Sequence, residues 1–209
     1  MDDNQRKTID SYNKTAKDFA DRIGRLGNYD DTYDFLVSKI RPGSDVLDLA
    51  CGPGQISLYI TQKIDAAITG VDLSREMLRI AAEHIPGGVF VESSMVDYKT
   101  DKRFDAVILG FGIPYLKKDE VKQCLGNSIN LLKSGSHIYI SFMEGDREGF
   151  EKTSFGGRND FYIHYHRKAD VIKILNDNGV TVTREFVLDY TEPNGDITKD
   201  IILIGVKNK

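Results

Sequence analysis

Two carboxylates and a glycine-rich loop are the residues of this sequence whose types and spacing could do chemistry. Asp48 stands inside an apolar run, VLDLACGPG, that breaks into a loop with Gly52 and Gly54. A carboxylate in a buried strand is costly unless backbone N–H groups or a bound ligand satisfy it. Glycines let a backbone come close to a ligand, and the helix behind them presents free N–H groups. The stretch therefore predicts a small-molecule site that includes Asp48.

The second carboxylate, Asp72, ends the next apolar run, in GVDLS, 18 residues beyond Gly54. At this position a carboxylate can accept hydrogen bonds from both hydroxyls of a ribose. Asp72 could instead cap the helix that begins at Ser74, but Ser74 is itself a good N-cap. The ribose role is therefore the favoured interpretation.

The loop and the two carboxylates suit two classes of ligand. A dinucleotide needs its diphosphate at the helix N-terminus, usually above GxGxxG, whereas Ser57 stands here in place of the third glycine. A carboxylate at Asp48 would also repel a diphosphate. A cationic ligand with an amino group and a ribose suits both carboxylates, and S-adenosylmethionine is such a ligand. A nicotinamide-dependent oxidoreductase remains the alternative.

The surrounding pattern predicts strands and helices in alternation. Strands are expected over 45–49, 67–71, 88–92, 104–109 and 136–142, and helices over 9–23, 31–40, 54–64, from 74, over 121–132 and over 171–175. A hairpin of 182–190 and 200–207 closes the chain around Pro193-Asn194-Gly195-Asp196. This order favours one α/β domain with a mostly parallel sheet and helices on both faces. Ligands of such sheets bind beyond the carboxyl ends of the strands, where Asp48 and Asp72 are expected.

The composition is that of an ordinary globular domain. The chain has 209 residues, of which 40% are hydrophobic and 29% charged, with a formal net charge of −4. No basic stripe is visible, so nucleic acid and anionic membranes are not favoured as partners. No run approaches the ~18 apolar residues of a membrane span, and the polar start is unlike a secretory signal. Two cysteines make no disulfide framework, so a cytoplasmic location is expected.

Four stretches carry a resemblance to a known family. VLDLACGPG, GVDLSREML, FDAVILGFGIPYL and LLKSGSHIYIS, in this order and spacing, resemble the motifs of class I S-adenosylmethionine-dependent methyltransferases. The resemblance implies an α/β fold, a Rossmann-like three-layer αβα sandwich. Its seven-stranded, mostly parallel sheet has an antiparallel last strand beside the fifth. A single domain over 1–209 is expected, with an N-terminal helical lid (1–40), a cofactor-binding core (41–142), a substrate lid segment (143–167), and a C-terminal helix and hairpin (168–209).

The resemblance also implies S-adenosylmethionine as the cofactor and a set of residues around it. The glycine loop would cradle the methionine part, Asp72 the ribose and Leu73 the adenine. Ser94 stands where many members have aspartate, so Asp97 is an alternative partner of the adenine. Tyr12 belongs to an aromatic helix that often covers the cofactor. The cofactor-binding residues expected are Tyr12, Asp48, Ala50, Gly52, Gly54, Asp72, Leu73, Met77, Ser94, Met95, Leu109 and Gly110.

The residues that would contact the methyl acceptor are less clearly marked in the sequence than those expected to bind the cofactor. Methyl transfer has a neutral leaving group, so holding the nucleophile in place and excluding water can supply most of the catalysis. A hydroxyl or ammonium nucleophile must also lose a proton to a base. His164 and His166 are the candidates, and they share a face with Tyr162 if DFYIHYH is extended. The alternative for this segment is a half-exposed polar strand or loop.

Tyr115, in GIPY, is a candidate substrate contact. No third ligand accompanies the two histidines, so no metal is predicted. The function predicted is methyl transfer from S-adenosylmethionine to an unidentified small molecule. A non-catalytic protein that binds S-adenosylmethionine or S-adenosylhomocysteine is the alternative to an enzyme, and the oligomeric state is left open.

Overall fold

A seven-stranded sheet forms the centre of the computed structural model, which describes residues 2–152, 160–191, 195 and 197–209. Its strands lie in the order β3-β2-β1-β4-β5-β9-β8. They are β1 (Ser44–Leu49), β2 (Ala66–Asp72), β3 (Val89–Glu92), β4 (Phe104–Gly110), β5 (Leu132–Met143), β8 (Val180–Thr191) and β9 (Ile197–Lys207). The pairs among β1 to β5 are parallel, and β9 is antiparallel to both β5 and β8. The expected sheet, with its antiparallel last strand beside the fifth, is confirmed.

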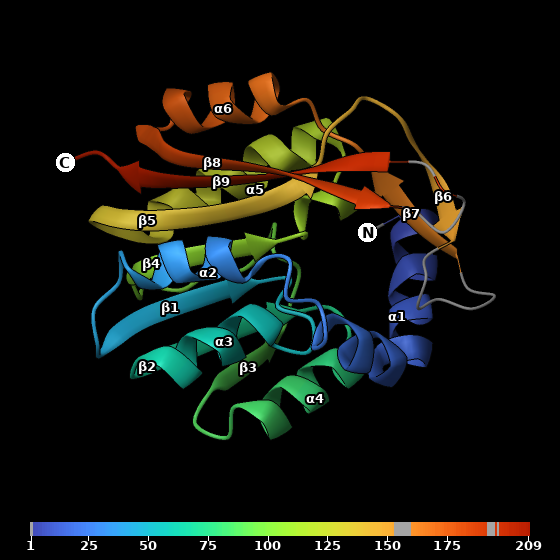
Figure 1. Cartoon of the computed structure of the whole chain (residues 1–209), viewed down its shortest axis with the longest axis horizontal. Coiled ribbons are helices and arrows are strands. Elements are labelled where there is room, and N and C mark those ends of the chain that lie inside the picture. The colour runs from blue at the N-terminus through green and yellow to red at the C-terminus, as the bar shows by residue number, and fades with distance from the viewer. Residues whose placement is uncertain (1, 153–159, 192–194, 196) are drawn as a thin grey trace.

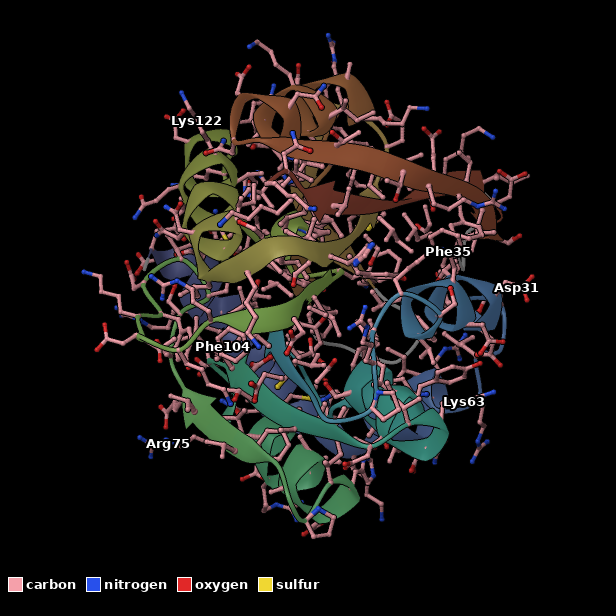
Figure 2. The ribbon with its side chains drawn as sticks, turned by 90° about the vertical axis from the view of Figure 1, so that its left-hand side faces the viewer. Asp31, Phe35, Lys63, Arg75, Phe104 and Lys122 are labelled. Carbon is pink, nitrogen blue, oxygen red and sulfur yellow. The ribbon has the colours of Figure 1, made fainter. Side chains whose placement is uncertain are left out.

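Helices cover both faces of this sheet and make the three layers of the sandwich (Figure 1). The helices are α1 (Asp3–Ile23), α2 (Asp30–Val37), α3 (Gln55–Lys63), α4 (Arg75–His84), α5 (Lys118–Leu131) and α6 (Lys168–Asp177). Apolar residues of α2 and α3 pack on one face, and those of α5 and α6 on the other. Their polar faces point outward, as Lys63 and Lys122 do in Figure 2. No described helix has the length and apolarity that a membrane crossing requires.

The central strand β1 shows why the sequence forms this fold. A parallel strand buried on both faces reads as a continuous apolar run, and VLDL does so except at Asp48. Leu47 and Leu49 pack toward α5, whereas Val46 packs toward α2 and α3. Because side chains alternate along a strand, Asp48 points to the same face as Val46. The carboxylate therefore faces the start of α3, at the carboxyl edge of the sheet.

Two further pieces lie at this carboxyl edge (Figure 1). Helix α1 packs on α4 and on β7 (Asp160–His164), which pairs antiparallel with β6 (Glu148–Lys152) as a two-stranded ribbon. A short 3₁₀ helix, η1 (Ile113–Tyr115), follows β4 and contacts β7. The expected helix over 9–23 begins earlier, because Asp2 caps α1 by accepting from the backbone N–H of Gln5. Helix α1 and the ribbon belong to the segments 1–40 and 143–167 for which lid roles are predicted; residues 1 and 153–159 of those segments lie outside the described residues.

Helix α2 is shorter than predicted, and the C-terminal hairpin is described except for part of its loop. Helix α2 ends at Val37 rather than at residue 40. The strands of the predicted hairpin are present and paired, but Pro193, Asn194 and Asp196 of its loop lie outside the described residues.

Gly54 lets the glycine loop pass directly over α4. Its φ is +81°, in the left-handed region, and a Cβ there would lie 3.3 Å from the Cβ of Ala81. Gly54 is also the residue from which α3 starts. Both the backbone conformation and the close approach of α4 therefore require glycine at this position.

We predict that Gly54→Ala lowers the free energy of unfolding by ~2–4 kcal/mol, of which ~1–2 reflects left-handed backbone and the rest overpacking. Gly135→Ala is the matched control, because Gly135 has φ +78° and a Cβ added there would meet nothing within 4 Å. It should lose only the ~1–2 kcal/mol backbone contribution. Urea denaturation measures both variants, and equal losses would rule out the close approach to α4.

Candidate functional site

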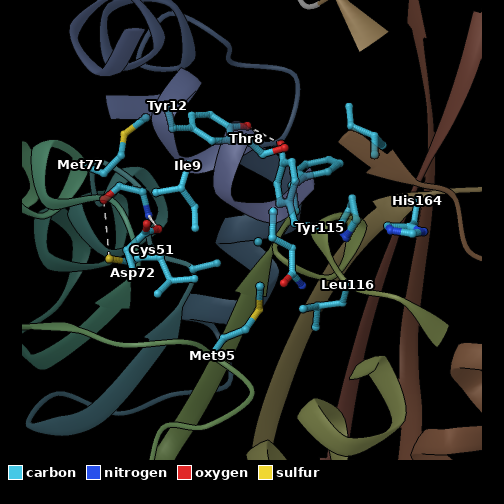
Figure 3. A pocket seen from close by; sticks show the side chains of 18 of the residues that line it. Thr8, Ile9, Tyr12, Cys51, Asp72, Met77, Met95, Tyr115, Leu116 and His164 are labelled. Atoms are coloured by element: carbon cyan, nitrogen blue, oxygen red, sulfur yellow. Dashed lines mark hydrogen bonds between the residues drawn. The ribbon is translucent and has the colours of Figure 1, made fainter. Parts of the chain in front are cut away.

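A cavity of about 690 Å³ lies at the carboxyl edge of the sheet. It is bounded by α1, by the segments that follow β1, β2, β3 and β4, by the β6–β7 ribbon and by the start of β9. Its volume is within the range of small-molecule pockets. Figure 3 shows side chains from these separate elements converging on the cavity.

Most of the residues expected to bind the cofactor line this cavity. Those that do are Tyr12, Asp48, Ala50, Gly52, Asp72, Leu73, Met77, Ser94, Met95 and Gly110. Asp97, the alternative partner of the adenine, lines it as well. Leu109 is instead fully buried in the core, and Gly54 sits behind the loop as the start of α3. Contact of any of these residues with a cofactor stays a prediction.

Asp48 is buried, with 2% of its surface exposed, and it lines the cavity. The hydroxyl of Ser57, on α3, donates to one carboxylate oxygen at 2.6 Å. Burial raises the pKa of Asp48 to about 7, although the bond from Ser57 pulls the pKa down. Ser57 is therefore a hydrogen-bond partner of Asp48. From the sequence, Ser57 had been noted only because it stands in place of a third glycine.

Asp72 ties the glycine loop to the start of α4. Figure 3 shows its side chain beside Cys51 of that loop. One of its oxygens accepts from the backbone N–H of Gly52 at 2.9 Å, and the other from that of Ser74 at 2.8 Å. Burial raises its pKa, and these backbone donors oppose the rise. A carboxylate has about four lone-pair sites, so two bonds leave capacity for ligand hydroxyls. The local structural role and the ribose role are therefore compatible.

Two non-glycine residues after the central strands have left-handed backbone. Ala50 follows β1 with φ 55°, Phe111 follows β4 with φ 53°, and both line the cavity. Such conformations cost roughly 1–3 kcal/mol each and concentrate at functional sites. The N–H of Phe111 donates to the hydroxyl of Ser141 on β5 at 2.9 Å, which holds the turn. Sequence reasoning missed Phe111, although its place directly after β4 was a signal.

An aromatic and acidic wall on the α2 side of the cavity was also missed. We call Tyr29, Tyr33, Phe111 and Asp200 the α2–β9 wall; all four line the cavity. Asp200 is buried, and its carboxylate accepts from the hydroxyl of Tyr29 at 2.6 Å. The sequence contained a signal for Asp200, because this aspartate directly precedes the apolar run IILIGV. Asp48 likewise stands within an apolar run.

Tyr12 and Tyr115 close the cavity on the α1 side (Figure 3). Their hydroxyls are hydrogen-bonded to each other, which links α1 to η1. Burial raises the pKa of Tyr115 to about 12 and that of Tyr12 well above its ordinary value. Both hydroxyls are therefore neutral near pH 7. Tyr115 can contact a substrate as a hydrogen-bonding group but not as a phenolate base.

The two candidate histidines differ in what they face. His164 lines the cavity, and its Nδ1 lies 2.7 Å from a carboxylate oxygen of Glu148 on the neighbouring strand. The ring of His166 stacks on it, but the Nε2–H of His166 donates to the carbonyl of Ile113 at 2.9 Å. Burial lowers the pKa of His166. Of the two, only His164 is among the described lining residues.

Within the described ranges, no three His, Cys, Asp or Glu side chains are grouped so that they could hold a metal ion.

Comparisons with known proteins agree with this architecture. Residues 46–135 match the family model described as a methyltransferase domain. A release factor glutamine methyltransferase of Fusobacterium nucleatum is 28% identical over 160 residues, which are 70% of this chain and 44% of that protein. A dTDP-3-amino-3,4,6-trideoxy-alpha-D-glucopyranose N,N-dimethyltransferase of Streptomyces venezuelae is 33% identical over 104 residues, 47% of this chain and 43% of that protein. The chain thus spans less than half the length of these curated relatives.

Solved structures match nearly the whole chain. A magnesium protoporphyrin IX methyltransferase from Synechocystis with bound S-adenosylhomocysteine has a TM-score of 0.77 at 21% identity, covering 99% of this chain and 100% of that one. The N-methyltransferase NodS from Bradyrhizobium japonicum has a TM-score of 0.72 at 13% identity, with 99% and 100% covered. Residues 46–135 thus match a methyltransferase domain model, and the chain has the Rossmann-like fold of these solved methyltransferases.

Proposed function

We propose that this chain is an S-adenosylmethionine-dependent methyltransferase that acts on a small molecule held in the cavity. The observation that carries the proposal is the pair of carboxylates, Asp48 and Asp72, which line one cavity beside the Gly52 loop. S-adenosylmethionine is a cation with an amino group and a ribose, and so it offers a partner to each carboxylate. The family match over 46–135 supports the same activity.

The residues present fit this cofactor better than a dinucleotide. A diphosphate needs free backbone N–H groups in the glycine loop. Here the N–H groups of Cys51, Gly52 and Gly54 already donate within the chain, to Val71, Asp72 and Cys51 respectively. The described basic residues that line the cavity are Lys117 and Lys152, at the start of α5 and on the ribbon, away from the loop. This disfavours the nicotinamide-dependent alternative.

Each part of the cavity has a role in the proposal. Asp48 would face the cationic methionine part, Asp72 the ribose hydroxyls, and Leu73 with Met95 the adenine. When bound, S-adenosylmethionine supplies a methyl group attached to a sulfonium sulfur. After transfer of the methyl group, that sulfur is a neutral thioether. The chain would position the acceptor and exclude water, and the Tyr12–Tyr115 contact closes one side for that purpose.

His164 is the proposed base, because it alone of the two histidines lines the cavity. Its Nδ1–H would donate to Glu148, which leaves Nε2 as the nitrogen that would take a proton from the acceptor. A base is useful only for an acceptor that must lose a proton.

One prediction separates the three candidate functions. S-adenosylhomocysteine should raise the thermal midpoint of the protein, and NAD should not. Labelled methyl groups from S-adenosylmethionine should appear in a product when the protein meets a cell metabolite extract. Stabilisation by NAD alone would contradict the proposal, and binding without turnover in any extract would leave a non-catalytic binder.

In the same assay, Asp72→Ala should weaken S-adenosylhomocysteine binding by about 10- to 100-fold, because hydrogen bonds to a charged group are worth about 1.5–3 kcal/mol. Asp65→Ala, at an exposed aspartate outside the cavity lining, is the matched control and should bind as the unaltered protein does. An unchanged affinity in Asp72→Ala would remove the ribose assignment.

Another prediction concerns how the affinity for S-adenosylhomocysteine depends on pH. Asp48 has a raised pKa of about 7, and only its ionised form attracts the cationic amino group. The affinity for S-adenosylhomocysteine should therefore be about tenfold higher at pH 8 than at pH 6. Asp48→Asn should flatten this dependence, and calorimetric titration at several pH values measures it. A pH dependence that survives in Asp48→Asn would assign the effect to another group.

The raised pKa of Asp48 also determines how the free energy of unfolding changes with pH in the absence of ligand. Because the folded-state pKa of Asp48 lies above the ordinary value, the folded chain binds more protons between roughly pH 4 and 7. Asp48 therefore lowers the free energy of unfolding as the pH rises through this window. Asp48→Asn should raise the thermal midpoint at pH 8 while it weakens ligand binding.

A further prediction distinguishes the roles of His164 and His166. His164→Gln should lower kcat by about 10²–10⁴-fold if the acceptor must lose a proton, with S-adenosylhomocysteine affinity within twofold. His166→Gln should chiefly lower the thermal midpoint, because it disturbs the bond to Ile113 that holds η1. Single-turnover kinetics and thermal denaturation measure the two effects. An unchanged kcat in His164→Gln would contradict its role as the base.

A further inference from the structure

The described lining of the cavity is strongly acidic. It contains seven carboxylates against two lysines, and one of these, Lys117, lies 2.7 Å from Asp2 in an ion pair. The carboxylates are Asp2, Asp48, Asp72, Asp97, Glu120, Glu151 and Asp200. Walls of one charge sign attract ligands of the opposite sign and repel their own. An acceptor with a phosphate or a carboxylate would be repelled here.

Two members of the α2–β9 wall, Phe111 and Asp200, lie at β4 and beyond it in the sheet, whereas most of the residues proposed to hold the cofactor lie at β1, β2 and β3. Asp48, Gly52 and Asp72 belong to β1, to the loop after it and to β2, whereas Phe111 follows Gly110 at the end of β4 and Asp200 pairs with Met143 at the end of β5. The order of strands in the sheet thus separates the two groups, although one cavity joins them. The wall is therefore one part of the cavity left for the acceptor, beside the ribbon that carries His164.

The side chains of this wall are arranged like a receptor for an organic cation. The ring of Tyr29 meets Phe111 edge-on at 5.5 Å between centroids, and Tyr33 lies next to Tyr29 at 6.4 Å. Tyr29 also donates to the carboxylate of Asp200, which is 3% exposed. An ammonium group is bound by aromatic faces, and more strongly when it is desolvated and a carboxylate lies beside it. No described lysine or arginine contributes to the lining at this wall.

We propose that the acceptor carries a protonated amine and that Tyr29, Tyr33, Phe111 and Asp200 recognise it. This inference rests on the proposed function, because it takes the wall as the acceptor half of a methyltransferase cavity. Asp200 supplies the charge, the three rings supply a desolvated surface, and the acidic lining rejects anionic acceptors. The wall thus determines the substrate class, separately from the residues that would bind the cofactor.

The test compares matched head groups on the complete chain saturated with S-adenosylhomocysteine. The probes are three sets of different size: propylamine, propanol and propanoate; cyclohexylmethylamine, cyclohexylmethanol and cyclohexanecarboxylate; benzylamine, benzyl alcohol and benzoate. In at least one set, calorimetric titration should give the amine an affinity at least about tenfold above that of the alcohol and the carboxylate. If no set shows this preference, the proposal is overturned.

Variants then locate the preference. Asp200→Asn keeps the shape and an acceptor for Tyr29, and it should remove most of the amine preference. Phe111→Leu should reduce the preference by several-fold, as expected for loss of one ring. Glu151→Gln removes a lining charge on the ribbon instead and should keep the preference. An amine preference that survives in Asp200→Asn, or is lost equally in Glu151→Gln, contradicts recognition by this wall.

Binding of S-adenosylhomocysteine is the readout that separates the two proposals. If the unaltered protein does not bind it, the proposed function fails. If it binds and no amine is preferred, only the amine inference fails. In Asp200→Asn and Phe111→Leu, an S-adenosylhomocysteine affinity within twofold of the unaltered protein demonstrates that the fold and cofactor half are intact.

Discussion

The hydrogen bonds of Asp72 are the interaction on which the geometry of the site depends. One side chain holds the Gly52 loop after β1 and the turn into α4 after β2, through bonds of 2.9 and 2.8 Å. It therefore fixes the two loops relative to each other at the carboxyl edge. The same bonds occupy the N–H of Gly52, which a diphosphate would otherwise use. The structural carboxylate of Asp72 thus also disfavours a diphosphate, and it keeps lone pairs that ribose hydroxyls could use.

A second constraint is the cost of burying acidic groups. Asp48 and Asp200 are each almost completely buried; Asp48 accepts a bond from the hydroxyl of Ser57, and Asp200 from that of Tyr29. The raised pKa of Asp48 expresses this cost, because burial penalises its ionised form. Left-handed backbone at Ala50 and Phe111 adds strain at the same edge. The chain thus keeps an unfavourable arrangement where a cationic ligand would relieve it.

Features read from local spacing were predictable from the sequence. The alternation of strands and helices with a final hairpin could be read from the sequence, whereas the place of the last strand beside the fifth was implied by the family resemblance. Asp48, Gly52 and Asp72 could be identified because each lies within, after or at the end of a predicted strand. The α2–β9 wall could not be predicted in this way. Tyr29 and Asp200 are 171 residues apart in the chain, and they meet only because β9 is inserted beside β5. Similarly, the two-residue spacing of His164 and His166 gave them a common face but not their different neighbours.

The central claim is that Asp72 and Asp48 hold the ribose and the cationic amino group of one ligand in this cavity. A crystal structure of the complex with S-adenosylhomocysteine tests it most directly. We predict ribose hydroxyl oxygens at hydrogen-bond distance, ~2.5–3.0 Å, from the Asp72 carboxylate, and the amino group on the side of Asp48. A ligand bound outside the cavity, or with its ribose away from Asp72, would contradict this account.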